Sequence, residues 1–374
     1  MENLSTEIGD GIHATPLYDD NGTYYFVNGN NISEYGITVT PTTQRVTEAE
    51  AYRNNANILC SKTILLSING TIGNVALYKS EPIMLGKSAC YINVSTKVNK
   101  DYIFHYLMMP KCQFYFTSEL TGTTIKNLSL KSVRRTKVSL PNLKEQNRIA
   151  QLFDAINERI VTQNKIIEDL KKLKSAIIDY AINSLDTDFA KFGSLYEKAG
   201  EGGTPTTSNA SFYDNGKIPF IKIDDLKQKY LIENKDFITE LGLQKSSAWL
   251  VPTSSILFSN GATIGEITIT TYPVCTKQGI LGIVPKQNID VEYLYYFMSS
   301  SYFKKAVSRI VTEGTMKTAY LKDINNILCP NPTKEKQHEI AQMPSALNSK
   351  IDLEQSILRL FYAQKQYLLR QMFI

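Results

Sequence analysis

The sequence contains an internal repeat at a spacing of 191 residues, and this repeat limits the folds open to the chain more than any other feature. Residues 144–183 align with residues 335–374 without a gap, and nine of the 40 pairs are identical. Further upstream, only short islands match, with spacings that drift between 189 and 192 residues. The chain therefore consists of one unit used twice, in which a variable globular part precedes a segment of fixed length.

The fixed segments have the composition and periodicity of long helices. Residues 145–181 contain no Gly and no Pro, and Leu, Ile, Ala, Lys, Glu and Gln predominate. Apolar residues recur at alternating steps of four and three in both segments, which is a heptad pattern. The predicted seam of the helix pair comprises Ile156, Ile160, Gln163, Ile167, Leu170, Lys174 and Ile177 in the first segment and Leu347, Ile351, Glu354, Leu358, Phe361, Lys365 and Leu368 in the second.

The polar interruptions of the seam favour an antiparallel pair. They fall at matching depths, at Gln163 and Glu354 and again at Lys174 and Lys365. Polar residues at seam positions specify register and partner at a cost in stability. Antiparallel helices would place Lys174 opposite Glu354 and Gln163 opposite Lys365, whereas parallel helices would stack the two lysines. The alternative is that each amphipathic helix lies separately on its own domain.

One residue departs from the helical pattern. Pro344 stands where the first segment has Phe153, and we expect it to start or kink the second helix at that point. At a rise of about 1.5 Å per residue, roughly 40 residues would make a rod of about 60 Å that holds two globular modules apart.

The two globular modules have a mixed α+β pattern. Short runs rich in Ile, Val, Thr, Tyr and Phe alternate with turn residues such as Asn69-Gly70. The predicted strands are residues 24–27, 63–68 and 75–78 in the first module and 218–223, 255–258 and 266–270 in the second, followed by helical stretches at 101–119 and 291–310. The predicted domains are residues 1–141, a helix at 142–185, residues 186–331 and a helix at 332–374.

The residues that most catalytic centres need are scattered. The chain has three histidines, none in an HxxxH or HExxH pattern, and no GxxxxGK[ST] loop for ATP. The five cysteines never occur as CxxC, which argues against a zinc site or a disulfide framework. We therefore expect a chain without catalytic activity or a metal of its own. The absence of an apolar run of about 18 residues and of a secretory signal predicts a cytoplasmic protein without a membrane span.

The order of module, helix, module, helix resembles the DNA specificity subunit of type I restriction-modification systems. The similarity covers essentially the whole chain. It includes the Gly/Thr-Pro openings at 11–16 and 202–205, the Asn-Gly turns, and the Gly-Thr islands at 122–123 and 314–315. Each long helix also begins with Pro-x-x-x-x-Gln-x-x-Ile, from Pro141 to Ile149 and from Pro332 to Ile340. Each motif is weak, but their order, repeated twice, is specific.

This resemblance implies a non-catalytic subunit with two target recognition domains, each of which reads one half of a bipartite, asymmetric sequence in double-stranded DNA. It also implies that the antiparallel helices set the half-site spacing and dock two copies of an adenine methyltransferase subunit. In such a complex S-adenosylmethionine belongs to the modification subunit, and ATP with Mg²⁺ belongs to a restriction subunit that cleaves DNA. The alternative function is a coiled-coil scaffold with two protein- or carbohydrate-binding modules. A fused methyltransferase or nuclease is disfavoured because the chain lacks the residues for it.

Candidate DNA contacts follow from charge and from the Gly-Thr islands. The net charge of +5 is too small to identify a partner, but seven basic residues and one acid lie between Lys126 and Arg148. Lysine and arginine in such strips can bind phosphates or guanine edges. The candidates are Thr123, Lys126, Lys131, Arg134, Arg135 and Lys137 in the first module and Lys304, Lys305, Arg309, Thr315 and Lys317 in the second.

Overall fold

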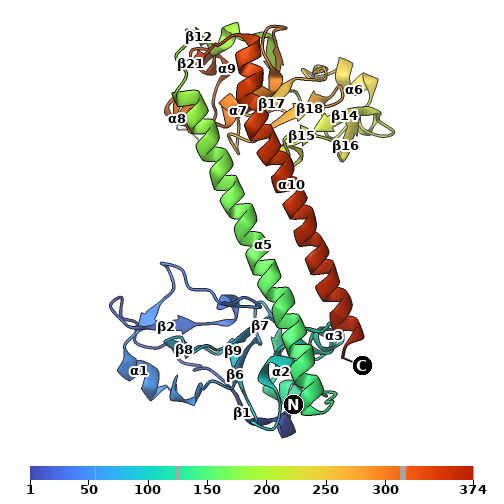
Figure 1. Cartoon of the computed structure of the whole chain (residues 1–374). Helices are drawn as coiled ribbons and strands as arrows, with labels where there is room; N and C mark the ends of the chain where they lie inside the picture. The colour runs from blue at the N-terminus through green and yellow to red at the C-terminus, as the bar shows by residue number, and fades with distance from the viewer. Residues whose placement is uncertain (55, 123–125, 312–316, 374) are drawn as a thin grey trace. The chain divides into compact units, whose positions relative to one another are not determined.

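The computed structural model describes residues 1–54, 56–122, 126–311 and 317–373. The chain divides into two compact units, each of which contains one module and a part of both long helices. Unit 1 comprises Met1–Asn164 with Ser356–Ile374, and unit 2 comprises Lys165–Gln355. The predicted α+β class and the packing together of two long helices are confirmed (Figure 1).

The first module is built around a mostly antiparallel sheet. Its strand order is β1-β9-β6-β7, and a smaller sheet of order β5-β2-β8 and a hairpin β3-β4 pack beside it. The strands are β1 (Ser5–Asp10), β2 (Tyr24–Val27), β3 (Ile32–Ser33), β4 (Gly36–Ile37), β5 (Arg45–Val46), β6 (Thr63–Ser67), β7 (Val75–Leu77), β8 (Ile83–Leu85), β9 (Ala89–Val94), β10 (Leu120–Thr121) and β11 (Asn127–Leu128). The helices of this module are α1 (Glu48–Arg53), α2 (Lys100–Met108), α3 (Pro110–Ser118) and α4 (Leu130–Arg135).

The second module repeats this arrangement. The main sheet has the order β13-β20-β17-β18-β15, and the smaller sheet has the order β16-β14-β19. The strands are β12 (Phe189–Lys191), β13 (Tyr196–Glu201), β14 (Ile218–Ile221), β15 (Tyr230–Leu231), β16 (Asp236–Ile238), β17 (Ile256–Ser259), β18 (Ile267–Thr270), β19 (Cys275–Thr276), β20 (Ile280–Pro285) and β21 (Leu328–Pro330). The helices are α6 (Glu240–Gln244), α7 (Val291–Ser299), α8 (Ser301–Ile310) and α9 (Leu321–Ile324).

The repeat extends to the register of the sheets. In the first module Ser5 pairs with Val94 across β1 and β9, and in the second Tyr196 pairs with Pro285 across β13 and β20, which is the same pairing displaced by 191 residues. Both ladders contain an irregularity directly after this pair. The same backbone has therefore been kept in both modules although few of their residues match.

The two helical stretches predicted for the modules are each interrupted once. In the first, α2 ends before Met109 and α3 begins at Pro110. Proline fits the first turn of a helix because its missing N–H has no partner there, and it disfavours helical backbone in the residue before it. In the second, Ser300 separates α7 from α8, and its side chain accepts a hydrogen bond from the backbone N–H of Phe303.

The long helices are α5 (Leu143–Asn183) and α10 (Lys334–Gln371). The prediction that Pro344 starts the second helix is wrong, because α10 begins ten residues earlier and Pro344 lies inside it. An interior proline loses one helical hydrogen bond and costs about 3 kcal/mol. Buried residues on both sides of it, Ala341 and Ile351, hold the helix against its surroundings.

Candidate nucleic-acid interface

A buried glutamine attaches the start of each long helix to the module that precedes it. The side chain of Gln146 accepts a hydrogen bond from the backbone N–H of Asn99 at 3.0 Å and donates one to Pro141 O at 2.8 Å. Gln337 makes the equivalent bonds to Asp290 N at 2.8 Å and Pro332 O at 2.9 Å. The glutamine of the repeated motif thus has the same two backbone partners in both modules.

A second pair of equivalent hydrogen bonds holds the segments that precede α5 and α10. Tyr102 on α2 donates its hydroxyl to Ser139 O at 2.7 Å, and Tyr293 on α7 donates to Pro330 O at 2.8 Å. Burial raises the pKa of Tyr102 to about 12 and also raises the pKa of Tyr293. The segment before each long helix is therefore held by a buried phenol that stays protonated.

One contact of this set differs in chemistry between the modules. In the first, the buried ring of His105 lies 3.0 Å from Asp154 Oδ1 of α5. The equivalent residue of the second module is Tyr296, whose hydroxyl donates to Ser345 of α10 at 3.1 Å. Ser345 also binds the buried amine of Lys229 at 3.0 Å. The two modules therefore contact their own long helices in the same places but with different polar groups.

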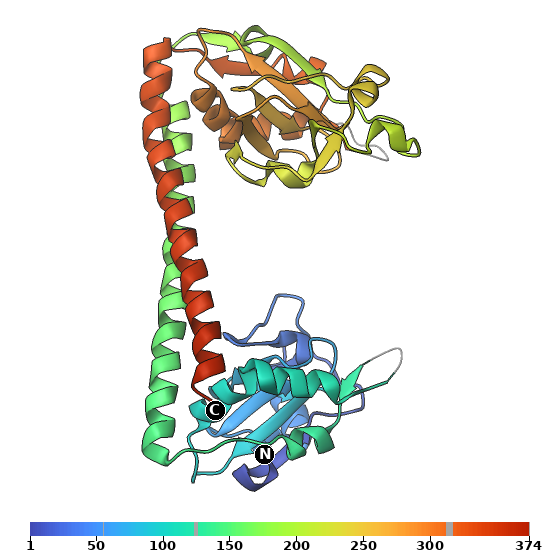
Figure 2. The ribbon, with the colours of Figure 1, turned by 90° about the vertical axis from the view of Figure 1, so that its right-hand side faces the viewer.

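The far end of each long helix packs on the other module of the repeat. Within unit 1, Phe373 near the C-terminal end stacks on Phe153 of α5 at a centroid distance of 5.5 Å and also contacts Tyr102. Figure 2 shows the end of α10 beside the helices of the first module. Within unit 2, Ile178 and Ile182 of α5 belong to the hydrophobic core of the second module. The start of each helix thus meets the end of the other, which makes α5 and α10 antiparallel within each unit.

The predicted seam residues are buried or half-buried along both helices, but the pairing of the charged ones differs from the prediction. Lys174 Nζ donates to Asn348 Oδ1 at 2.9 Å instead of pairing with Glu354, and Glu354 forms an ion pair with Lys350 on its own helix at 2.5 Å. Burial lowers the pKa of Lys174, against the opposing effect of Asp352. The helical register is therefore offset from the one that places Lys174 opposite Glu354.

The other seam lysine is held by the first module. Lys365 Nζ lies 2.5 Å from Glu34 Oε2, at the turn of the β3-β4 hairpin, and the neighbouring Tyr35 hydroxyl lies 2.6 Å from that of Tyr362. The predicted partner of Lys365 was Gln163, and the ion pair with Glu34 takes its place. A sequence argument confined to the two helices could not find a partner in a hairpin more than 300 residues away.

One end of the main sheet in each module gathers several loops. In the first module, the backbone of Ile68, just after β6, donates to Ser88 O at 3.0 Å and accepts from Leu128 N at 2.8 Å. In the second, Asn260 donates to Gly279 O at 3.0 Å and accepts from Ala319 N at 2.9 Å. The residues that follow the Gly-Thr islands are therefore fixed beside the Asn-Gly loops in both modules.

The Asn-Gly loops are wider than the predicted tight turns. Residues 68–74 connect β6 to β7, with Gly70 and Gly73 at φ values of 75° and 92° that side-chain-bearing residues rarely adopt. Gly11, in the opening segment, has a different role. A Cβ atom at Gly11 would lie 2.0 Å from Leu85 O, and one at the equivalent Gly202 would lie 2.1 Å from Thr276 O. These glycines let the opening segments approach the neighbouring strands.

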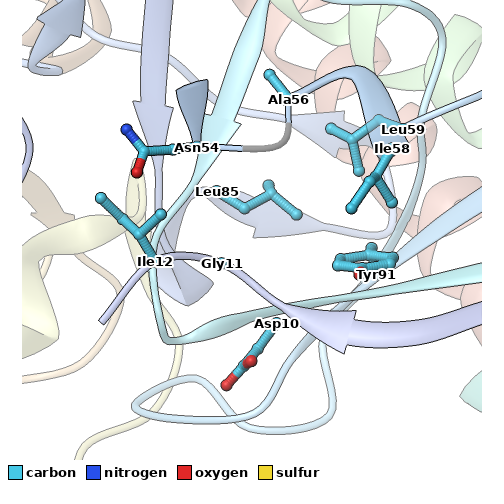
Figure 3. Close-up of a pocket in the computed structure, with 9 residues that line it drawn as sticks. All are labelled: Asp10, Gly11, Ile12, Asn54, Ala56, Ile58, Leu59, Leu85 and Tyr91. Atoms are coloured by element: carbon cyan, nitrogen blue, oxygen red, sulfur yellow. The ribbon is translucent and has the colours of Figure 1, made fainter. Parts of the chain in front are cut away.

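A small pocket lies next to the opening segment of the first module (Figure 3). It has a volume of about 150 Å³, and Ile12, Leu85 and Ile58 line it with apolar surface. Asp10 points away from Leu85 and binds His13 at 2.9 Å, and the amide of Asn54 donates to Glu50. The polar side chains of Asp10 and Asn54 therefore bind residues outside the lining of the pocket and do not converge on the cavity.

Within the described ranges, no cluster of three or more His, Cys, Asp or Glu side chains is placed to hold a metal ion. Over the same residues, no helix offers a stretch long and apolar enough to cross a lipid bilayer.

Comparison with known proteins identifies the family. Residues 11–172 and 186–360 match the sequence profile described as "Type I restriction modification DNA specificity domain". The chain belongs to this specificity-domain family.

Relatives in the specificity-domain family align over most of the chain. The MjaIX specificity subunit of Methanocaldococcus jannaschii is 25% identical over 80% of this chain and 74% of its own length. The MjaVIII subunit of the same organism is 24% identical over 83% and 76%, respectively. The crystal structure of the S subunit from M. genitalium has the same fold, with a TM-score of 0.58 at 18% identity over 100% of this chain and 94% of that one.

The residues that were predicted to contact DNA differ in their exposure. Lys126, Lys131, Arg135 and Lys137 are exposed in the first module, and Lys304, Lys305, Arg309 and Lys317 are exposed in the second. Arg134 is half-buried, and its guanidinium donates to Ile8 O at 2.6 Å, which gives it a role in the fold of the module. Thr123 and Thr315 lie outside the described residues. The DNA-binding role of the others stays a prediction.

Proposed function

We propose that this chain is a DNA sequence-specificity subunit in which each module reads one half of a bipartite, asymmetric target. The observation that carries the proposal is that both modules keep one backbone register and one set of attachments to the long helices, while the residues of their loops differ. A conserved frame with variable loops is what two readers of different half-sites require, because the frame fixes orientation and the loops supply base contacts.

We further propose that α5 and α10 set the distance between the half-sites and dock two copies of an adenine methyltransferase subunit. Both helices carry apolar side chains at steps of seven residues on surface that is exposed. On α5 these are Ile166, Leu173 and Tyr180, and on α10 they are Leu353, Leu360 and Tyr367, all with at least 40% of the residue exposed. Exposed apolar stripes of this kind mark protein interaction surfaces. The two stripes occupy different positions of the repeat, since the residues equivalent to Leu173 and Tyr180 are Gln364 and Gln371, but each helix offers one apolar surface to one partner.

In this proposal the chain itself is non-catalytic and acts with partners. The methyl group comes from S-adenosylmethionine held by the methyltransferase subunits, and a restriction subunit that uses ATP and Mg²⁺ joins the complex to cleave unmodified DNA. The residues of this chain hold the duplex and orient it toward the bound methyltransferases.

Mapping of methylated adenines tests this proposal. The chain is expressed together with an adenine methyltransferase subunit encoded beside it, in a host that lacks both. We expect methylated adenines in one bipartite motif with a fixed spacer, and none when this chain is omitted. Replacement of the second module by that of a relative should change one half of the motif and leave the other half intact. Methylation of a continuous motif without a spacer, or of sites that share no motif, would contradict the proposal.

A further inference from the structure

Two exposed lysines stand on either side of one backbone position in each module. In the first module that position is Ile68, which bonds to Ser88 on one side and Leu128 on the other. Lys87 directly precedes Ser88, and Lys126 lies two residues before Leu128. Both lysines are exposed. The strands that flank a central strand are about 10 Å apart, so the two amines can be close enough to act on the same ligand.

The second module has the same arrangement. Asn260 bonds to Gly279 and to Ala319, and the exposed residues Lys277 and Lys317 lie two residues before these two. Lys87 and Lys277 occupy corresponding turns, before β9 in the first module and before β20 in the second. The sequence contains few matches between the modules in these regions, yet both retain a lysine on each of the two loops. The sequence pattern indicates Lys126 and Lys317 but not Lys87 and Lys277, because each of these is an isolated lysine in a short turn.

These four lysines have no ion-pair partner among the described residues. Two carboxylates on the strands paired with β9 and β20, Asp10 opposite Cys90 and Glu201 opposite Leu281, have other partners. Asp10 binds His13, and Glu201 accepts a hydrogen bond from the backbone N–H of Gly279 at 2.8 Å. Exposed amines held at one edge without acidic partners favour binding of an anion.

The opposite end of the same sheet has a different use. β9 leads from Ala89 at the loop end to Val94, and the chain then enters α2, whose start is tied to α5 through Gln146. β20 leads likewise to α7, which is tied to α10 through Gln337. One end of each sheet is therefore attached to the long helices, and the lysines lie at the other end of β9 and β20.

We infer that Lys87 with Lys126, and Lys277 with Lys317, bind backbone phosphates of the two DNA half-sites, so that the loop end of each main sheet faces the duplex. This inference rests on the proposed function, because it names the part of each module that meets DNA. Phosphate contacts orient a protein on the duplex without reading bases. The Asn-Gly loops and the segments after the Gly-Thr islands lie beside these lysines and are thereby brought to the base edges.

The salt dependence of DNA binding tests this assignment. Binding of the full chain to a fluorescently labelled DNA duplex of random sequence is measured over a range of salt concentrations. The logarithm of the binding constant falls linearly with the logarithm of the salt concentration. Each lost phosphate contact should make this negative slope shallower by about one unit. We expect a loss of roughly two units for the double variant Lys87→Ala/Lys277→Ala and a larger loss when Lys126→Ala and Lys317→Ala are added.

Lys97 and Lys286 provide a matched control. Both are exposed, and they follow the opposite ends of β9 and β20. The double variant Lys97→Ala/Lys286→Ala removes the same charge from the same modules and should leave the slope unchanged. An equal loss in both double variants, or no loss in either, would overturn the assignment and leave the proposed function standing. Failure of the unaltered chain, alone and with a methyltransferase subunit, to bind duplex DNA would contradict the proposed function itself.

Discussion

At the scale of single residues, the identical glutamines of the repeat have a structural explanation. Gln146 and Gln337 are 4% and 1% exposed, and each joins two backbone groups of its module. Gln151 and Gln342 are also identical in the repeat, but both are exposed. Sequence comparison alone could not separate these two pairs, because the difference lies in burial.

The buried glutamine should contribute to stability and the exposed one should not. Gln146→Leu leaves the N–H of Asn99 and the carbonyl of Pro141 unpaired, and each such group costs about 1–3 kcal/mol. We expect the free energy of unfolding to fall by about 2–4 kcal/mol. Chemical denaturation would show this as a lower midpoint. Gln151→Ala on the same helix is the control and should shift this midpoint little. Equal effects of both substitutions would contradict the explanation.

Buried phenols predict sensitivity to alkali. The pKa of Tyr102 is raised to about 12 in the folded chain, from an ordinary value of 10.0. The unfolded chain therefore loses this proton first as the pH rises, so stability is fully present below pH 10 and falls between pH 10 and 12. Denaturation midpoints measured across this range should decline, and the decline should be smaller in Tyr102→Phe. An identical pH profile for the variant would show that another group causes the loss.

At the scale of elements, the heptad pattern predicted two long paired helices but not their register. Periodicity reports which face of a helix is buried, whereas register depends on which side chains meet. Lys174 reaches Asn348, and Lys365 reaches a hairpin of the first module. Near its C-terminal end, α5 buries Ile178, one position beyond the predicted Ile177, and Ile182 one turn later, because this part of the helix packs on a module. The pattern of an isolated helix pair does not contain that information.

The seam should carry much of the stability of the helix pair. Ile160 is fully buried on α5, while its neighbour Val161 is 55% exposed. We expect Ile160→Ala to destabilise the chain by about 2–4 kcal/mol through lost burial and a residual cavity. Val161→Ala should stay within about 0.5 kcal/mol. Thermal denaturation followed by far-UV circular dichroism would detect the difference, and similar values for the two variants would place the seam elsewhere.

At the scale of the whole molecule, the domain boundaries predicted from the sequence differ from the boundaries of the two compact units in the structure. The sequence suggests that modules end where helices begin, at residues 141 and 331. The compact units instead divide both helices, because each helix begins on one module and ends on the other. The β1-β9 and β13-β20 ladders pair at the same offset of 191 residues, which shows that the repeat extends into the modules. Few residues match between the modules, because the same strand pairing can form with many different side chains.

The packing of the C-terminal end on the first module can be tested by changing Phe373 and measuring hydrogen exchange in α2. Phe373 packs with Phe153, Tyr102 and Tyr106 in the core of that module. Phe373→Ala should cost about 3–5 kcal/mol, and hydrogen exchange should accelerate in α2 while α7 keeps its protection. Gln371→Ala, at the exposed last residue of α10, is the control. Unchanged exchange in α2 would contradict the packing.

Because Leu369 and Phe373 complete the core of the first module, this module precedes the second in the chain but acquires all of its core later. At about 5–20 residues per second, the 220 residues that follow Phe153 up to Phe373 take about 10–40 s to synthesise. During that interval the aromatic surface of Tyr102 and Phe153 lacks its cover, so a nascent chain of this type is a natural client for chaperones that bind exposed apolar segments.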